Sequence, residues 1–257
     1  RSLEIAEKSL GPDHPNVATA HNNLAELLRA ANRLKEAEPL YRRATEIWEK
    51  GLGPDHPNVA AALNNLARLL RDTNRLKEAE PLYRRATVIW EKSLGPDHPN
   101  VAAALNNLAE LLQNTSRLKE AEPLFRQALE IDEKSFGPDH PNVARDLNNL
   151  GELLRATNRL EEAEPLYRRA MEIYERSLGP EHPNVAAAIN NLAMLLHDTN
   201  RLKEAEPLYR RATEIYERSL GPDHPNAVLA LNNLAALLQD TNRLKEAEPL
   251  YRRATEI

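Results

Sequence analysis

The sequence has no cysteine among its 257 residues, which excludes a disulfide framework, a thiol nucleophile and a zinc–thiolate site. Aromatic residues make up only 4% of the chain, so a hydrophobic core has to be built from leucine, alanine, isoleucine and valine. No apolar run is long enough to span a membrane and no signal-like segment occurs, so we expect a soluble, cytoplasmic protein. The net charge of −5 disfavours binding to nucleic acid or to an anionic membrane.

Glycine is also scarce, with 8 residues, yet six of them begin one recurring motif, Gly-Pro-Asp/Glu-His-Pro-Asn. The copies start 42 residues apart, at Gly11, Gly53, Gly95, Gly137, Gly179 and Gly221. Sequence periods of this length are typical of repeat proteins. The predicted organisation is a partial helix of a preceding repeat at 1–10, followed by six repeats at 11–52, 53–94, 95–136, 137–178, 179–220 and an incomplete 221–257.

Each copy predicts two helices, as the third copy illustrates. Pro99 suits the first position of a helix, where its missing N–H costs nothing. Apolar residues then keep helical spacing as far as Leu112, and the polar segment 114–117 interrupts the pattern. A second helix begins near Leu118 and ends before Gly137. Tandem helix pairs predict an all-α fold, an α-solenoid of helix-turn-helix repeats.

Small and aromatic residues recur at fixed places in these helices. The first helix carries Ala25 and the second carries Ala37, Tyr41 and Ala44, and these types recur every 42 residues except at Phe125 and Gly151. The pattern resembles the tetratricopeptide repeat, and the longer unit with its Gly-Pro-Asp-His-Pro-Asn lead-in is similar to the repeats of kinesin light chains. The resemblance implies a right-handed α-solenoid whose first helices line a concave, ligand-binding groove.

The two asparagines of a recurring Asn-Asn-Leu motif occupy different sides of the first helix. On a helical wheel, Asn106 lies in the middle of a polar stripe, and Asn107 lies at the edge of the apolar side. Residues along the stripe differ between copies while core positions hardly change, which predicts a scaffold with a variable binding surface. The predicted groove residues are Asn22, Arg29, Asn64, Arg68, Arg71, Asn106, Glu110, Gln113, Arg145, Asn148, Arg155, Asn190, Met194, His197 and Asn232.

The first asparagines have two interpretations, which are compatible with each other. Their amides could hydrogen-bond to the backbone of an extended peptide, whatever its sequence. Alternatively, they could form a ladder between adjacent repeats with no ligand involved. The second asparagines are better explained as structural, because half-buried amides must find hydrogen-bond partners.

The variable positions of the stripe combine arginines with carboxylates. Arginine pairs well with a carboxylate in two-pronged geometry, so an acidic peptide is the leading prediction for the ligand. The alternative is that the arginines pair with carboxylates in the same groove. In the fifth repeat, Met194 lies close to His197 in the sequence, and the sixth repeat adds Leu229 and Ala236. This region is predicted to accept an apolar or aromatic side chain.

Other motifs have structural explanations. The histidine before each first helix predicts a helix cap, because helices packed about 8–10 Å apart would keep the copies from sharing a metal ion. Arg42 of the Tyr-Arg-Arg-Ala segment lies four residues from both Glu38 and Glu46, the spacing of ion pairs on a helix surface. No nucleophile–base arrangement and no phosphate-binding loop occurs. The sequence therefore predicts no enzyme activity, metal, cofactor or nucleic-acid partner.

These observations favour a protein-interaction scaffold that binds a peptide segment of a protein partner in its groove. One alternative is a self-associating structural module, in which ends without polar capping repeats stack head to tail. A further alternative is the sensor or spacer part of a larger multidomain signalling protein. The mixed charge of the variable stripe favours the peptide-binding scaffold.

Overall fold

The structure is a computed structural model that describes residues 8–255, and every regular element in this range is an α-helix. Of the predicted partial helix at 1–10, residues 8–10 are helical and residues 1–7 lie outside the described range. The chain divides into two compact units, Arg1–Ser135 (unit 1) and Phe136–Ile257 (unit 2). The all-α fold of tandem repeats is therefore confirmed, and each unit is described separately below.

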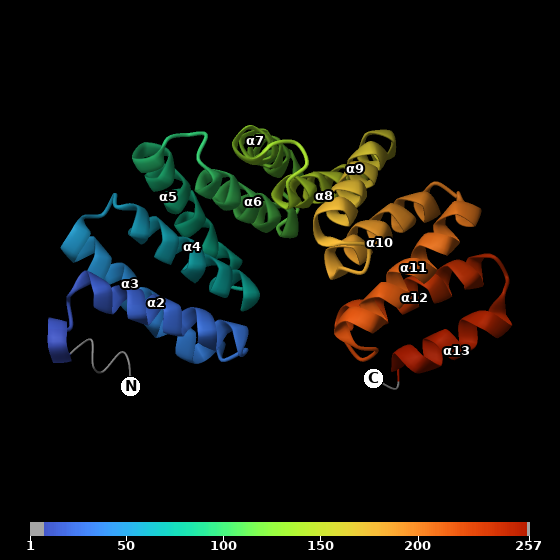
Figure 1. Cartoon of the computed structure of the whole chain (residues 1–257), viewed down its shortest axis with the longest axis horizontal. Helices are drawn as coiled ribbons and strands as arrows, with labels where there is room; N and C mark the ends of the chain where they lie inside the picture. The colour runs from blue at the N-terminus through green and yellow to red at the C-terminus, as the bar shows by residue number, and fades with distance from the viewer. Residues whose placement is uncertain (1–7, 256–257) are drawn as a thin grey trace. The chain divides into compact units, whose positions relative to one another are not determined.

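Both units are built from antiparallel pairs of helices (Figure 1). Unit 1 contains α2 (Pro15–Ala30), α3 (Leu34–Leu52), α4 (Pro57–Asp72), α5 (Leu76–Leu94), α6 (Pro99–Asn114) and α7 (Leu118–Phe136). Unit 2 contains α8 (Pro141–Ala156), α9 (Leu160–Leu178), α10 (Pro183–Asp198), α11 (Leu202–Leu220), α12 (Pro225–Asp240) and α13 (Leu244–Thr255). We call the even-numbered helices A helices and the odd-numbered ones B helices.

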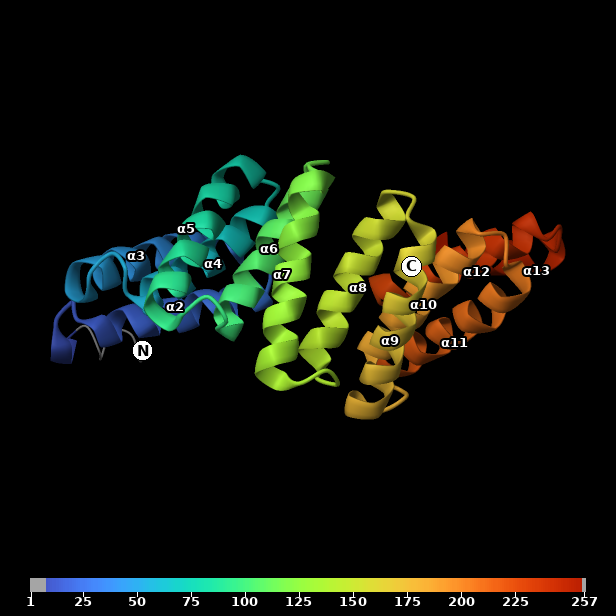
Figure 2. The same ribbon diagram turned by 90° about the horizontal axis from the view of Figure 1, so that it is seen from above.

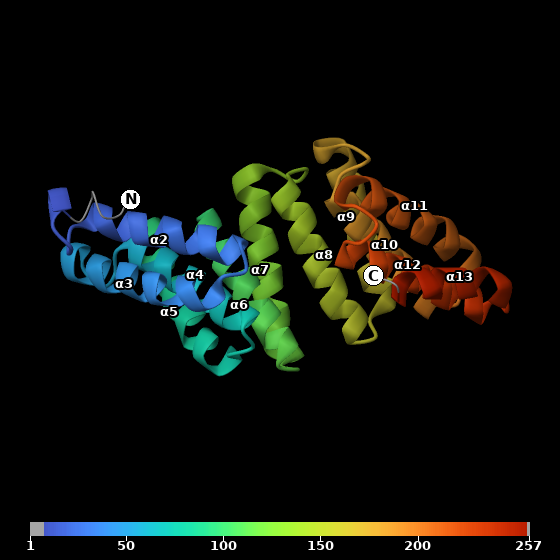
Figure 3. The same cartoon turned by 90° about the horizontal axis from the view of Figure 1, so that it is seen from below.

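Within each unit, the helices pack in chain order. Figure 2 shows α8 and α9 side by side in unit 2, and Figure 3 shows α2 and α3 side by side in unit 1. Each B helix α3, α5, α9 and α11 also contacts the A helix that follows it. Neighbouring A helices contact each other as well, at α2–α4 and α4–α6 in unit 1 and at α8–α10 and α10–α12 in unit 2. The A helices therefore form one continuous layer in each unit.

Histidine and proline together start each A helix. In α4, Nδ1 of His56 accepts a hydrogen bond from the backbone N–H of Asn58 at 3.1 Å, and Pro57 occupies the first helical position. Equivalent bonds form at His14, His98, His140, His182 and His224. The predicted role of these histidines as helix caps is confirmed.

The chain reverses direction at residues with positive φ angles. Between the A and B helices of a repeat, Asn74 has φ 59°, a left-handed conformation that asparagine tolerates better than most residues. After the B helix, Gly95 has φ 94° and ψ 154°, a region that is essentially restricted to glycine. These two turn types recur in every repeat within residues 8–255, which keeps the helix pairs in the same register.

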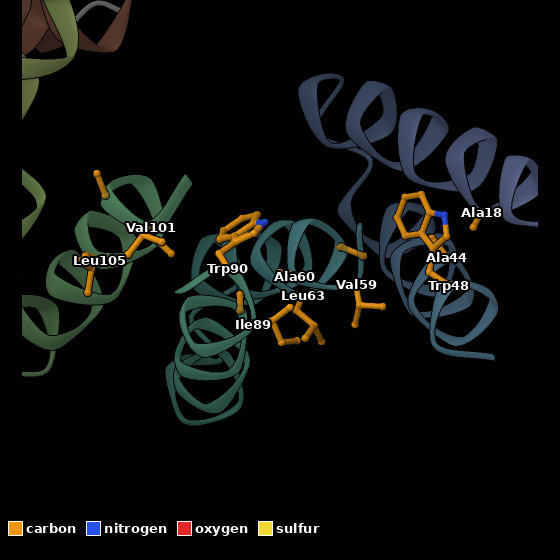
Figure 4. Packing of buried hydrophobic residues seen from close by; sticks show 14 of the residues in the cluster. Ala18, Ala44, Trp48, Val59, Ala60, Leu63, Ile89, Trp90, Val101 and Leu105 are labelled. Atoms are coloured by element: carbon orange, nitrogen blue, oxygen red, sulfur yellow. The ribbon is translucent and has the colours of Figure 1, made fainter. Parts of the chain in front are cut away.

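The core is aliphatic, as the composition predicts. In unit 1, buried alanine, valine, leucine and isoleucine residues surround two tryptophans (Figure 4). Trp48 lies beside Ala18 and Ala44, and its indole N–H donates a hydrogen bond to the carbonyl oxygen of Pro15 at 3.1 Å. This bond joins a B helix to the A helix of the same repeat. It also satisfies the one polar atom of the Trp48 side chain, which is only 4% exposed.

Ion pairs cover the outer surface of the B helices. Glu38 accepts hydrogen bonds at 2.7 Å from Arg42 of the same helix and from Arg75 at the start of α5. Burial alone would raise the pKa of Glu38, but the bonds from these arginines outweigh it and lower the pKa. Equivalent bonds in unit 2 join Glu164 to Arg168 and Arg201. The prediction that Glu46 also pairs with Arg42 is wrong, because Arg42 is engaged by Glu38 and Glu46 contacts Arg43 at 3.4 Å.

Candidate functional site

The candidate site is the variable stripe of the A helices, considered separately in each unit. We define the A-helix stripe by the five positions that share one side of each A helix. In unit 1 it consists of Thr19, Asn22, Glu26, Arg29, Ala30, Ala61, Asn64, Arg68, Arg71, Asp72, Ala103, Asn106, Glu110, Gln113 and Asn114. In unit 2 it consists of Arg145, Asn148, Glu152, Arg155, Ala156, Ala187, Asn190, Met194, His197, Asp198, Leu229, Asn232, Ala236, Gln239 and Asp240.

Hydrogen bonds between asparagines connect neighbouring A helices. In unit 1, Nδ2 of Asn65 donates to Oδ1 of Asn22 at 3.2 Å, and Nδ2 of Asn107 donates to Oδ1 of Asn64 at 3.0 Å. In unit 2, the corresponding bonds join Asn191 to Asn148 and Asn233 to Asn190, both at 3.1 Å. Each bond runs from the second asparagine of one repeat to the first asparagine of the preceding repeat. We call these bonds the amide ladder.

The amide ladder explains why asparagine recurs in the middle of the A helices. The second asparagines act structurally, as the sequence predicts, and the first asparagines supply the acceptors. This arrangement uses only part of the hydrogen-bonding capacity of each first asparagine. Within the described residues, no protein group accepts a hydrogen bond from Nδ2 of Asn22, Asn64 or Asn148. The ladder therefore forms without consuming these N–H donors.

The arginines of the unit 1 stripe all pair with carboxylates of the same stripe. The pairs are Arg29–Asp72 at 3.1 Å, Arg68–Glu26 at 2.8 Å and the close Arg71–Glu110 pair. Each pair joins adjacent A helices, so the ion pairs run alongside the amide ladder. The internal pairing that the sequence left open as an alternative is present here, and any acidic ligand would have to exchange with these carboxylates.

The unit 2 stripe has a different composition. Arg155 pairs with Asp198 at 2.5 Å, and Arg145 pairs with Asp146, which is fully buried beside it. Nε2 of His197 lies 2.8 Å from Oδ2 of Asp240.

Two large apolar side chains occupy stripe positions of unit 2. Leu229 lies where the other repeats carry alanine, threonine or arginine, and Met194 lies where four of the five other repeats carry a charged residue. Leu229 exposes 55% of its surface, and Met194 is half-buried. Sδ of Met194 lies 3.4 Å from Nδ2 of Asn190, so the thioether accepts a weak hydrogen bond from a ladder asparagine. The unit 2 stripe therefore combines apolar side chains with carboxylates.

Tyrosine hydroxyls of the B helices approach the A-helix stripe from the core side. The sequence did not predict these contacts. The hydroxyl of Tyr41 donates a hydrogen bond to Glu26 at 2.5 Å. The hydroxyl oxygens of Tyr83 and Tyr167 are buried and have no hydrogen-bond partner among the described residues. Burial raises the pKa of Tyr83 to about 12. Phe125 at the equivalent place shows that only the ring is required for packing.

Residues 8–255 contain neither a cluster of metal ligands nor a membrane-spanning helix. In this range, no group of three or more histidine, aspartate or glutamate side chains could hold a metal ion. No helix of this part of the chain has both the length and the apolar character needed to cross a membrane.

Comparison with family models agrees with this architecture. The model described as Tetratricopeptide repeat matches residues 1–50, 34–87, 75–134, 101–176, 147–218 and 185–257, which together span the chain. No curated protein sequence matches the chain.

Solved structures with the same fold include repeat proteins of the kinesin light chain type. BtubC (BKLC) from P. vanneervenii has a TM-score of 0.73 and is 23% identical over 87% of this chain and 90% of that chain. A putative kinesin light chain from Podosopora anserina, with nearly identical TPR-like repeats, has a TM-score of 0.65 and is 25% identical over 78% and 95%. PilF from Pseudomonas aeruginosa has a TM-score of 0.63 and is 20% identical over 93% and 90%.

Proposed function

Because the chain belongs to the tetratricopeptide repeat family, whose members generally serve as protein-interaction scaffolds, we propose that it binds an extended peptide segment of a protein partner along the A-helix stripe. The observation that carries the proposal is the unused Nδ2–H donor of the first asparagines Asn22, Asn64 and Asn148. These three asparagines lie beside side chains that vary from repeat to repeat, whereas Nδ2 of Asn190 already donates to Sδ of Met194. A ligand would therefore meet a common set of backbone contacts and a variable set of side-chain contacts.

The spacing of the donors suits an extended chain. Packed helices lie about 8–10 Å apart, so Asn22 and Asn64 on adjacent A helices present their amides at about that interval. An extended peptide advances about 3.3–3.6 Å per residue, so about three peptide residues span the interval between two of these amides. Binding through the backbone does not depend on the ligand sequence, which suits donors of one kind in several repeats.

We further propose that an acidic side chain of the ligand binds unit 1 by exchange. The carboxylate of Glu110, whose side chain is 37% exposed, pairs with Arg71 at the surface of the stripe. Arg71 is 21% exposed, so water still reaches both partners; pairs accessible to water contribute only about 0–1 kcal/mol, and replacing one carboxylate by another costs little. A ligand carboxylate in two-pronged contact with Arg71 would then add to the backbone contacts.

The test is a substitution that removes the donor and keeps the ladder. In Asn64→Asp, the carboxylate still accepts the bond from Asn107 but has no N–H to offer a ligand. We expect this variant to bind short neutral peptides about 2–10-fold more weakly than the wild type, the loss of one hydrogen bond. Asn107→Ala is the matched control, because it breaks the ladder bond and retains the Nδ2–H group of Asn64. Equal affinity of the wild type and Asn64→Asp for every bound peptide would contradict the proposal.

A second candidate function is head-to-tail self-association, favoured by two exposed leucines. Leu27 in α2 is 67% exposed and Leu244 in α13 is 57% exposed, whereas Leu69, the equivalent of Leu27 in the next repeat, is fully buried. Packing of one copy's α13 region against another copy's α2 region would cover both leucines. Sedimentation over a range of protein concentrations tests this contact, and a monomer at the highest concentration would exclude it.

A further inference from the structure

We propose that the unit 2 stripe selects a peptide segment in which two apolar side chains lie about four residues apart and a basic side chain lies next to them. The inference rests on the proposed peptide-binding function and adds the chemistry of the ligand. It is carried by the apolar residues Leu229 and Met194, by their position beside the amide ladder, and by the charge of Asp240.

The two apolar residues are exceptions among equivalent positions of the repeats. Leu229 is 55% exposed, and the same position holds Thr19, Ala61, Ala103, Arg145 and Ala187 in the other repeats. Met194 replaces the charged residues Glu26, Arg68, Glu110 and Glu152 of four other repeats. Isolated exposed leucines are ordinary on protein surfaces. Here, however, two unusual apolar residues occur on the same stripe of adjacent A helices.

Two hydrogen bonds of Asn190 place these residues on either side of one rung of the ladder. Asn190 accepts a bond from Asn233 at 3.1 Å and donates to Sδ of Met194 at 3.4 Å. Leu229 lies one turn before Asn233 on α12, and Met194 lies one turn after Asn190 on α10.

The distance between the two apolar residues follows from the direction of these helices. Helices α10 and α12 run in the same direction, because the Asn190–Asn233 contact near the middle and the His197–Asp240 contact near the end both join residues 43 apart. Leu229 and Met194 are offset by eight residues along this direction, about 12 Å, and lie on adjacent helices about 8–10 Å apart, so they are separated by about 15 Å. An extended peptide advances about 3.3–3.6 Å per residue and its alternate side chains share a side, so side chains four residues apart lie about 14 Å apart on the same side. Two apolar side chains at that spacing can contact Leu229 and Met194 together.

The charge beside the apolar residues favours a cation on the ligand. Among the described residues, the one ion-pair partner of the Asp240 carboxylate is His197, at 2.8 Å, which compensates the charge only when the imidazole is protonated. Asp72, the equivalent residue of unit 1, lies near two arginines, Arg29 at 3.1 Å and Arg71 at 3.8 Å. Asp240 is also the last residue of α12, where the helix dipole favours a positive charge. A lysine or arginine of the ligand would neutralise this end of the stripe.

The experiment measures binding of an array of short synthetic peptides to the full chain. The array varies apolar, basic, acidic and serine residues independently at each position. We expect peptides with paired apolar residues and an adjacent lysine or arginine to bind most tightly. Leu229→Ala should weaken the binding of these peptides about tenfold, since the side chain would lose most of its contact area. Asp240→Asn should weaken it severalfold and reduce its dependence on salt.

Val88→Ala is the control for truncating an exposed apolar residue. Val88 is 45% exposed, but it lies on the B helix α5 of unit 1 and should leave binding unchanged. All three variants should keep the wild-type melting temperature, because each residue is exposed. If peptides bind without apolar or basic preference, or if Leu229→Ala binds as the wild type does, the inference is wrong and the proposed function stands. If no peptide binds, both are wrong.

Discussion

The stripes of the two units each carry an amide ladder but differ in the residues beside it. In unit 1, arginines and carboxylates of adjacent A helices pair with one another, as in Arg68–Glu26 at 2.8 Å. In unit 2, apolar residues and the His197–Asp240 contact occupy much of the same surface. The comparison shows that the ladder and the turns keep the backbone the same in both units, while a few side chains on one side of the A helices change its chemistry.

The largest expected effect distinguishes an ion pair with a fully buried carboxylate in unit 2 from one with a partly exposed carboxylate in unit 1. Arg145→Ala leaves the carboxylate of Asp146, which is fully buried, without its arginine partner. We expect a loss of about 2–3 kcal/mol in the free energy of unfolding, near the lower end for breaking a buried pair because Arg145 is itself 38% exposed. Arg71→Ala in unit 1 should cost about 0–1 kcal/mol, because Glu110 remains accessible to water. Urea denaturation of both variants measures the difference, and equal losses would show that burial of the carboxylate is not decisive.

The next largest effect on stability concerns the amide ladder, which is present in each unit. Asn107→Ala in unit 1 and Asn191→Ala in unit 2 each remove one donor and leave an amide oxygen of the preceding repeat without it. We expect each substitution to lower the free energy of unfolding by about 1–2 kcal/mol, the cost of a lost hydrogen bond at a partly buried site. Because the geometry is the same in the two units, the losses should agree closely. A loss confined to one unit would show that the ladder has different roles in the two.

A smaller effect separates the tyrosines beneath the stripe. Tyr41→Phe removes the hydrogen bond to Glu26 and should cost about 1 kcal/mol. Tyr83→Phe and Tyr167→Phe remove buried hydroxyls that have no partner within the described residues, so they should be neutral or slightly stabilising. Thermal melts of the three variants test this order. If Tyr83→Phe destabilises as much as Tyr41→Phe, the Tyr83 hydroxyl has a partner such as an ordered water molecule.

The same tyrosines predict a dependence on alkaline pH. The pKa of Tyr83 is raised from 10.0 to about 12 by burial, so the folded protein holds this proton more tightly than the unfolded chain does. Between about pH 10 and 12 the folded state therefore binds more protons than the unfolded state, and stability falls as the pH rises. Urea midpoints measured at several pH values in this range should fall less steeply in Tyr83→Phe than in the wild type. Identical slopes would show that Tyr83 titrates at the same pH in the two states.

The fold could be predicted from the sequence because the same helix-starting and helix-ending residues recur every 42 residues. A proline after a histidine begins each A helix, as at Pro99, and a glycine that adopts positive φ follows the B helices, as at Gly95. These residues act locally, so their positions along the chain are sufficient to place the helices. The helical wheel likewise separates the core from the stripe, since both lie on a single helix.

The partners across repeats could not be predicted, because they depend on how adjacent A helices align. The ladder joins residues 43 apart, as in Asn65–Asn22, whereas Arg71–Glu110 joins residues 39 apart. A period of 42 residues does not indicate these offsets. The surroundings of the Tyr83 hydroxyl could not be predicted for a related reason. Tyr83 is a buried residue of a B helix, and the sequence does not show that its hydroxyl lies near the stripe residues Arg71 and Glu110. Contacts between elements thus required the three-dimensional structure.

The smallest expected effect tests how closely the two units can be made alike. Gly151 of unit 2 occupies the position of Ala67 in unit 1, and a Cβ atom built on it would lie 2.9 Å from Cε1 of Tyr167. Alanine in a helix is favoured over glycine by about 1 kcal/mol, but here the ring of Tyr167 would have to move. Unit 1 accommodates Ala67 together with a fully buried Tyr83, so a small shift of the ring should be sufficient. We expect Gly151→Ala to change the free energy of unfolding by less than about 1 kcal/mol, measured by urea denaturation. A larger loss would show that Tyr167 is held in place by its surroundings, and that unit 2 differs from unit 1 in its packing as well as in its stripe.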